Sequence, residues 1–422
     1  MMNLALISGG NWNEGANAGV WARNWNNHRT NTNNNVGFRA SDYDPSPESP
    51  KRADWGHRDG SVLHSGEIRG PLNSSIHQET VFMPIRHGNL FDQVATLDAL
   101  HAAYLRARKG KRRKRPVQHF ERDLGANLAR LERELLDGTY RPGPYRQFWV
   151  HEPKPRRISA PSFPDVVVQH AVYAVIYPIF DRTFCHDAYG CRMAKGHHRA
   201  SDQVQRFLRA SPADSYTLQM DIRKYFYRID RDVLMRQIER RIKDPRLLDL
   251  IRAFAQFDEP TGVPIGNLLS QLFSSIYLDD LDQFVKRELK VKRYARYVDD
   301  FLIVGVTKDQ AHAYRRTIEA WLAQNLRLEL SRWTVAPVRR GVNFVGFRTW
   351  RSIRLVRKHS LCRFSRRLRA GLVPNLVSIL GNARHTASHA HLCRRMIQER
   401  PDLLARLPNP VRATVARYER TA

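Results

Sequence analysis

Asp299 and Asp300 are adjacent acids between two stretches, residues 293–298 and 301–306, that have the composition of β-strands. This arrangement predicts a hairpin with both carboxylates at its tip. Two ionised carboxylates side by side repel each other, so a fold that keeps both usually holds a cation there. Oxygen ligands of this kind suit Mg²⁺, which keeps several waters and completes its shell with substrate phosphates. The pattern therefore favours a magnesium site over the alternative, a solvated Asp-Asp turn.

A third acid, Asp221, ends another β-like run at residues 216–220. One strand-end aspartate together with a later Asp-Asp hairpin is what two-metal phosphoryl transfer needs. We expect Asp221 and Asp299, assisted by Asp300, to hold two Mg²⁺ ions about 3.5–4 Å apart. These three residues are the predicted catalytic centre.

The composition indicates a polyanionic partner. The chain has 422 residues, with 70 Lys and Arg against 41 Asp and Glu, so its formal charge is +29 (70 − 41). Nucleic acid is the leading candidate for that partner. A basic membrane-surface protein is the alternative, but the sequence has no run of 18 apolar residues and no basic leader followed by an apolar stretch. The four cysteines form no C-x-x-C pair, which suits a reduced cytosol, so a cytoplasmic protein is expected.

The elements that must position the acids are predicted between residues 85 and 350. Strands are expected at 145–150 and 157–159, paired around a basic Pro-rich turn, and at 216–221. Helices are expected near 90–104, 120–136, 165–180, 231–242, 268–289 and 311–326, and residues 342–347 are expected to close the sheet. Strands and helices mix without strict alternation, which indicates an α+β fold rather than a doubly wound sheet.

The two ends of the chain differ from this middle part. Residues 1–80 are rich in Asn, Pro, Ser and Gly and show no periodic apolar face, so we expect them to be disordered. Residues 347–398 contain no acid and twelve Lys or Arg, with apolar positions at helical spacing, which predicts a cationic helical subdomain over 351–422. Eight of the ten residues 106–115 are basic, which favours phosphate contact over a merely solvated face. The expected nucleic-acid-binding residues are Arg108, Lys109, Lys111, Arg112, Arg113, Lys114 and Arg115 in this run, and Arg363, Arg366 and Arg367 in the tail.

Residues 97–407 resemble the reverse transcriptases, and within them those of diversity-generating retroelements. The likeness lies in the order of motifs, which are similar to residues 152–160, 167–192, 219–226 and 297–300. The resemblance implies a right-hand polymerase, with fingers and palm at residues 85–350 and a helical thumb at 351–422. The implied activity is RNA-directed DNA synthesis, in which one Mg²⁺ activates the primer 3′-hydroxyl and the other holds the triphosphate and its leaving pyrophosphate.

The same resemblance implies roles for residues beside the acids. Ile222, which follows Asp221 in the first catalytic motif, joins the expected metal-binding set. Phe226, five residues after Asp221, falls where the family places a steric gate that favours dNTPs over rNTPs; the alternative is a core aromatic. The triphosphate would be gripped by three basic residues that could otherwise be solvated, namely Lys154, Arg156 and Arg157.

Residues 265–271, Ile-Gly-Asn-Leu-Leu-Ser-Gln, carry the resemblance to the subclass. Most reverse transcriptases have Gln before this Gly and Pro after this Ser, whereas the retroelement enzymes have a branched apolar residue and a final Gln. Replacing an amide that braces the incoming nucleotide by a hydrocarbon would remove a hydrogen bond and loosen base-pair checking. Ile265, Gly266 and Gln271 are therefore expected in the nucleotide site, and the implied function is error-prone cDNA synthesis from a template-repeat RNA for targeted gene diversification.

The N-terminal sequence and the partners follow from the same resemblance. Residues 9–13 and 24–39 resemble the variable region of the lectin-like targets of such elements, so residues 1–40 are interpreted as translated template rather than as a fused ligand-binding module. The implied partners are template RNA, the RNA/DNA hybrid, dNTPs and a small basic ring-forming accessory protein, in a bacterial or phage-encoded system without a membrane. Two alternatives stay open: a reverse transcriptase of another subclass (group II intron-like, retron or phage defence), and a catalytically inactive RNA-binding protein.

Overall fold

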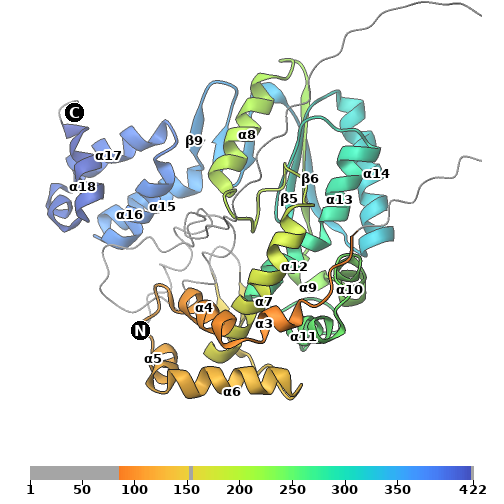
Figure 1. The fold of residues 1–422 in the computed structure, drawn as a ribbon. Helices are drawn as coiled ribbons and strands as arrows, with labels where there is room; N and C mark the ends of the chain where they lie inside the picture. The colour runs from red at the N-terminus through yellow and green to blue at the C-terminus, as the bar shows by residue number, and fades with distance from the viewer. Residues whose placement is uncertain (1–84, 152–154, 420–422) are drawn as a thin grey trace, which may run out of the picture.

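The computed structural model describes residues 85–151 and 155–419 and has the mixed α+β architecture expected (Figure 1). The expected N-terminal extension, residues 1–80, lies outside the described residues. Within the described part, the strands form three antiparallel sheets, of two, four and three strands. In spatial order these are β1 (Arg146–Val150) and β2 (Arg156–Ala160); β4 (Tyr294–Tyr297), β5 (Asp300–Val306), β3 (Tyr216–Ile222) and β6 (Leu330–Pro337); and β7 (Val342–Phe344), β8 (Phe347–Thr349) and β9 (Arg354–Val356).

The helices fall into three groups along the chain. Those before β3 are α3 (Phe91–Val94), α4 (Leu97–Arg108), α5 (Arg115–Arg122), α6 (Leu124–Leu136), α7 (Phe163–Asp181) and α8 (His197–Arg209). Those between β3 and β6 are α9 (Tyr225–Arg228), α10 (Arg231–Glu239), α11 (Pro245–Ala255), α12 (Leu268–Tyr277), α13 (Asp279–Gln283), the π-helical turn η2 (Phe284–Glu288) and α14 (Lys308–Leu326). After β6 come η3 (Val338–Arg340), α15 (Lys358–Arg369), α16 (Val373–Ala383), α17 (Ser388–Glu399), η4 (Pro401–Arg406) and α18 (Asn409–Ala416).

Polar side chains set the start of the principal helices. The Ser162 hydroxyl accepts a hydrogen bond from the Asp165 amide at the start of α7. Thr307 and Gln310 form a reciprocal capping box at the start of α14, in which each side chain accepts from the other residue's main-chain amide. Such caps satisfy amides that have no partner within the helix. The helix bounds therefore follow local sequence at these points.

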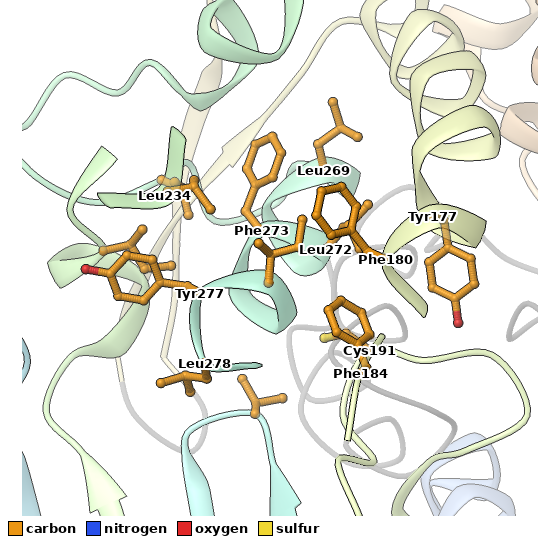
Figure 2. Close-up of a cluster of buried hydrophobic side chains, with 14 of the residues drawn as sticks. Tyr177, Phe180, Phe184, Cys191, Leu234, Leu269, Leu272, Phe273, Tyr277 and Leu278 are labelled. Carbon is orange, nitrogen blue, oxygen red and sulfur yellow. The ribbon is translucent and has the colours of Figure 1, made fainter. Parts of the chain in front are cut away.

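The main hydrophobic core lies around α7 and α12 (Figure 2). Length and composition alone would let α7 cross a membrane, but most of this helix is buried inside the protein, as in the core helix of a folded domain. Aromatic and aliphatic side chains from both helices pack together here, among them Tyr177, Phe180, Leu269, Leu272, Phe273 and Tyr277. Helix α8 packs against β4 and β5, and α14 packs against β3, β5 and β6, which joins the four-stranded sheet to this core.

A second hydrophobic core serves the C-terminal part of the chain. It begins at Phe347 on β8 and continues through α15–α18, which Figure 1 shows as a group beside β9. The main core ends at Phe344, so the change from one core to the other falls at residues 345–346. The expected boundary between residues 350 and 351 lies a few residues later, in the connection from β8 to β9.

Residues 342–347 do not close the four-stranded sheet, contrary to the expectation. They contribute β7 and the start of β8 to the separate three-stranded sheet, and β6, which was not predicted, pairs with β3 instead. Strand β6 is an edge strand whose middle residues are exposed, so its sequence lacks the apolar alternation that marks a half-buried strand.

The predicted helices over 120–136 and 268–289 are both broken. The first divides at Asp123 into α5 and α6, and the second divides at Leu278 into α12, α13 and the π-helical turn. At the second break Asp279 accepts a hydrogen bond from the Cys185 amide, a contact between segments 94 residues apart. Apolar periodicity does not register a long-range polar contact of this kind, which explains the missed break.

Asp244 ties the beginning of the described chain to α11, and its removal is expected to destabilise the fold. Its carboxylate accepts from the amides of Leu90 and Phe91, both at 2.8 Å, and from the Leu247 amide at 3.2 Å. Burial alone would raise the pKa of Asp244, but these main-chain hydrogen bonds lower it below its usual value. Its stabilising contribution is therefore present at neutral pH and is lost as the pH falls through this lowered pKa.

We expect Asp244→Ala to lower the free energy of unfolding by about 2–4 kcal/mol, because it removes a helix cap and leaves buried amides without an acceptor. Urea denaturation at pH 7 measures this. Asp249→Ala, an exposed change on the same helix, should stay within about 0.5 kcal/mol of the unmodified protein. Equal effects of the two changes would contradict the anchoring role.

Candidate active site

The four-stranded sheet brings the three predicted acids together. In the pairing of β3 with β5, Asp221 lies directly opposite Asp300, and in the pairing of β3 with β6 it lies opposite Arg332. Residues directly opposite one another on antiparallel strands point to the same face, so these three side chains share one face. Asp299 lies at the hairpin tip, where its main-chain carbonyl accepts from the Ile222 amide at 3.1 Å. The expected hairpin with acids at its tip is confirmed.

The turn that carries Asp299 is strained. Only Val298 and Asp299 separate β4 from β5, and Val298 has a φ of 57°. Two-residue hairpins with a positive φ at this position favour Gly, and a β-branched residue there is unusual, with a cost of about 1–3 kcal/mol. Gly190 covers the turn: a Cβ at this glycine would lie 2.6 Å from the Val298 nitrogen. The surrounding structure therefore holds the turn in a conformation that its own sequence does not favour.

Burial and mutual repulsion raise the pKa of two of the acids. Burial, followed by the charge of Asp221, raises the pKa of Asp299 to about 6, while Arg156 and Arg332 act in the opposite direction. Burial also raises the pKa of Asp300 to about 7, with the charges of Asp299 and Asp221 adding to the effect. A hydrogen bond from Gln219 Nε2 to Asp300 Oδ1, 2.8 Å long, partly offsets this rise. A bound cation would relieve the same repulsion.

The acids are tied to neighbouring side chains in this arrangement. Ser331 Oγ donates to Asp221 Oδ2 at 2.7 Å, and Arg332 Nε lies 3.4 Å from the same oxygen. Among residues 85–151 and 155–419, no group of three or more His, Cys, Asp or Glu side chains is arranged to hold a metal ion. The chemistry of the donor set nevertheless fits Mg²⁺, because it consists of oxygen ligands whose repulsion a cation would neutralise. The Ile222 side chain is a buried hydrocarbon, so this residue offers only main-chain groups.

Of the three basic residues expected to bind the triphosphate, the described contacts place only Arg156 near the acids. Burial lowers the pKa of the guanidinium of Arg156, on β2. The charges of Asp299 and Asp221 act on this group and partly offset the lowering. Arg157, the next residue, forms an ion pair with Glu259 at 2.7 Å and is not placed beside the acids by any described contact. Lys154 lies outside the described residues.

Phe226 and Ile265 meet in a small apolar cluster. Ile265, Val150 and Ile158 form its buried part, and Phe226 packs against it. The Ser159 amide donates to the Ile265 carbonyl at 2.7 Å, which joins the 265–271 segment to β2.

The other two motif residues, Gly266 and Gln271, occupy tight positions. Gly266 has a φ of 121°, and a Cβ there would lie 2.7 Å from the Ser159 carbonyl oxygen, so close approach to β2 requires glycine. Gln271 is nearly fully buried within α12.

The expected nucleic-acid-binding residues differ in availability. Arg108 pairs with Glu121 at 2.8 Å and lies over the Tyr104 ring, so its contacts are internal. Burial lowers the pKa of Lys111 to about 8 and also lowers the pKa of Lys114. The exposed members are Lys109, Arg112, Arg113 and Arg115 in the basic run and Arg366 on α15, whereas Arg363 and Arg367 are partly buried.

Several residues that act on this site were not predicted. Gln219 contacts Asp300, Ser331 contacts Asp221, and Arg296 reaches the turn from behind the sheet. Gln219 could have been found, because it lies two residues before Asp221 and strand alternation places both on one face. Ser331 could not have been found in this way, because the sequence of β6 lacks the alternation that predicts a strand.

The raised pKa values predict an unusual pH dependence of stability without metal. A folded-state carboxyl whose pKa lies above its unfolded value is destabilising when it ionises, so stability should fall as the pH rises from about 4 to about 7. At pH 7.5 in chelator, we expect Asp300→Asn to raise the free energy of unfolding by roughly 1–3 kcal/mol, since one pKa unit corresponds to about 1.4 kcal/mol.

Urea denaturation at pH 4.5, 6.0 and 7.5 tests this, with the difference expected to shrink toward pH 4.5. Asp214→Asn, at an exposed turn, is the matched control and should show no such trend. A constant difference between Asp300→Asn and the unmodified protein at all three pH values would refute the explanation by burial and repulsion.

The chain is similar to several known proteins. Residues 151–349 match the family described as reverse transcriptase (RNA-dependent DNA polymerase). Protein YkfC of Escherichia coli (strain K12) is 29% identical over 286 residues, with 56% of this chain and 73% of YkfC covered. The group II intron-encoded protein LtrA of Lactococcus lactis subsp. cremoris is 30% identical over 177 residues, with 39% of this chain and 29% of LtrA covered. A telomerase structure from Candida albicans, in complex with a fragment of telomeric RNA, has a TM-score of 0.43 at 13% identity, with 63% of this chain and 55% of that one covered.

The matched residues include β2, the strands of the four-stranded sheet, and the hairpin that carries Asp299 and Asp300. Residues 151–349 therefore form a reverse transcriptase (RNA-directed DNA polymerase) domain.

Proposed function

We propose that this protein synthesises DNA on an RNA template at the site formed by Asp221, Asp299 and Asp300. The observation that carries the proposal is the pairing of Asp221 with Asp300 at the end of the two central strands, with Asp299 held at the adjacent hairpin tip. When bound, Mg²⁺ would activate the primer 3′-hydroxyl and stabilise the charge on the leaving pyrophosphate. Asp221 and Asp299, with Asp300 and the Ile222 carbonyl assisting, are the residues that would hold it.

Neighbouring residues would bind and orient the nucleotide. Arg156 supplies a positive charge within the electrostatic reach of Asp299 and suits a triphosphate oxygen. Phe226, packed against the cluster that contains Ile265, has the bulk to contact a sugar 2′-hydroxyl and so to favour dNTPs. Arg332 pairs with Asp221 and so places a positive charge beside this carboxylate. A right-hand division into fingers, palm and a basic helical thumb beginning near residue 351 is part of this proposal.

A catalytically inactive RNA-binding protein is the alternative, and one substitution separates the two. We expect Asp299→Ala to reduce primer extension to under about 1% of the unmodified enzyme, because the carboxylate serves the metal, while RNA affinity changes less than twofold. Primer extension and filter binding on the same preparations measure both quantities.

Asp214→Ala is the control for removal of an exposed acid and should keep full activity. Retention of more than a few per cent of polymerase activity by Asp299→Ala would refute the metal role of this residue.

We further propose that the enzyme is of the diversity-generating type, which copies a template-repeat RNA with errors at adenine and works with a basic accessory protein. Support comes from Ile265 and Gln271 in the 265–271 segment and from the position of Ile265 in an apolar cluster with Phe226. A hydrocarbon at this point offers no hydrogen bond to a nascent base pair. The similarity to LtrA instead supports the group II intron-like alternative, and copying fidelity discriminates between the two.

We expect Ile265→Gln to lower misincorporation opposite template adenine roughly two- to tenfold, the effect of one hydrogen bond worth about 0.5–1.5 kcal/mol. Single-nucleotide incorporation of each dNTP opposite adenine, without manganese, measures this, and the effect opposite other bases should be smaller. Ile265→Leu keeps the hydrocarbon and controls for altered packing. An unchanged error ratio in an active Ile265→Gln enzyme would place the infidelity elsewhere and remove the support for this subclass.

A further inference from the structure

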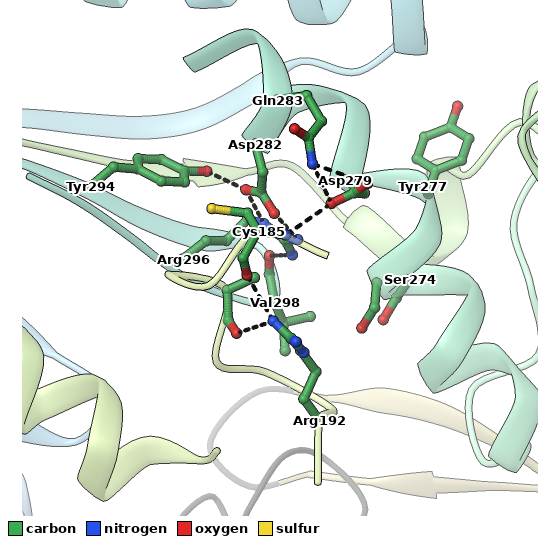
Figure 3. Close-up of polar contacts among 12 residues, drawn as sticks. Cys185, Arg192, Ser274, Tyr277, Asp279, Asp282, Gln283, Tyr294, Arg296 and Val298 are labelled. Atoms are coloured by element: carbon green, nitrogen blue, oxygen red, sulfur yellow. Dashed lines mark hydrogen bonds and ion pairs between the residues drawn. The ribbon is translucent and has the colours of Figure 1, made fainter. Parts of the chain in front are cut away.

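A buried ion pair lies behind the hairpin that carries Asp299. Arg296, the third residue of β4, is 2% exposed, and Asp282 on α13 is fully buried. Arg296 Nε donates to Asp282 Oδ1 at 2.7 Å and Nη2 donates to Oδ2 at 2.5 Å, so the carboxylate is bound by both arms of the guanidinium (Figure 3). Strand pairing places Arg296 opposite Phe301, on the core side of the sheet and away from the face of the acids.

The third nitrogen of this guanidinium, Nη1, contacts the turn itself. Arg296 Nη1 donates to the main-chain carbonyl of Val298 at 3.1 Å. This carbonyl belongs to the peptide group that joins Val298 to Asp299. Because Val298 has a strained backbone, the peptide needs outside contacts to keep its orientation, and Arg296 supplies one of them.

Asp282 and the helical segment that carries it are fixed by several contacts. The Tyr294 hydroxyl donates to Asp282 Oδ1 at 2.7 Å. One helical turn earlier, Asp279 accepts from the Cys185 amide, and Lys286 on the following π-helical turn pairs with Asp187 at 3.2 Å. Burial would lower the pKa of Arg296, but the charge and hydrogen bonds of Asp282 outweigh it and raise the pKa, so the guanidinium stays charged. The Arg296 guanidinium, which donates to the Val298 carbonyl, is therefore fixed in place by its ion pair with Asp282 on α13.

We propose that Arg296 is a positioning residue of the polymerase site: clamped by Asp282, it fixes the Val298–Asp299 peptide and thereby aims the Asp299 carboxylate at the position where Asp221 also points. This inference rests on the proposed function and extends it to residues on the hidden side of the sheet. Misplacement of a catalytic group by about 1 Å can cost about a hundredfold in rate, so the positioning contact acts on turnover.

A purely structural ion pair is the competing explanation, and it makes a different prediction. Replacing both members of a buried pair by apolar residues is often neutral or stabilising. Arg296→Met combined with Asp282→Leu should therefore fold, yet it leaves the Val298 carbonyl without its donor. Arg296→Lys keeps the charge but loses the forked geometry that reaches Asp282 and Val298 together.

The test compares these two variants with Arg354→Lys, a buried arginine on β9 that pairs with Asp202 at 2.7 Å and does not contact the turn. Steady-state primer extension gives kcat and the KM for dNTP, filter binding gives the Kd for template–primer, and thermal melting reports folding. Electron paramagnetic resonance of Mn²⁺ gives a readout of ion binding that does not require turnover.

For Arg296→Lys and the double variant, we expect kcat to fall about 10- to 100-fold and Mn²⁺ affinity to fall severalfold. The KM for dNTP and the Kd for template–primer should change less than about twofold, and Arg354→Lys should match the unmodified enzyme in kcat, KM, Kd and Mn²⁺ affinity.

A folded double variant with kcat within twofold of the unmodified enzyme would overturn the inference, as would a loss of kcat matched by equal losses of RNA and nucleotide affinity. If Arg296→Lys fails to fold, the double variant decides alone. Absence of DNA synthesis by the unmodified enzyme is a separate result, which would refute the proposed function itself.

Discussion

Three carboxylates at the end of one sheet repel each other, and much of the surrounding structure counteracts that repulsion. Asp221 is paired with Arg332, Asp300 accepts from Gln219, and Arg156 lies within the electrostatic reach of Asp299. Burial makes the repulsion stronger, because charges in a protein interior are poorly screened. The raised pKa values of Asp299 and Asp300 are the visible result. A bound cation would reduce the repulsion among these carboxylates more directly than another protein side chain would.

Local sequence patterns predicted the elements that carry the acids. The β-like run before Asp221, the hairpin around Asp299 and the helix over 165–180 were all predicted from short-range patterns, and each element is present in the structure. The missed features depend on contacts between distant segments. Strand β6 forms by pairing with the edge of β3, and its own sequence does not predict it. The break at Leu278 accompanies a hydrogen bond that Asp279 accepts from the Cys185 amide, in a loop distant in sequence.

The sequence alone could not show which of the two arginines Arg156 and Arg157 faces the acids. Both are basic residues of β2 and were expected to serve the triphosphate, but neighbours along a strand point to opposite faces. Only Arg156 is placed by its electrostatic contacts near the acids, while Arg157 pairs with Glu259. Once β2 is predicted as a strand, its alternation limits the choice to one arginine, although deciding which one requires the position of the acids. The same reasoning holds for Arg296, whose place on the core side of β4 follows only from the register with β5.

The close approach of Gly190 to the hairpin gives two neighbouring positions unequal freedom to vary. The missing Cβ of Gly190 would meet both the Val298 side chain and the Val298 main-chain nitrogen at 2.6 Å. A smaller residue at 298 would remove the first clash but not the second, because the nitrogen is common to all residues. Evolution can therefore change the side chain at position 298 without changing position 190, whereas no substitution at 298 opens position 190. Among related enzymes that keep this backbone, position 190 should be fixed as glycine even where the residue before the two acids differs.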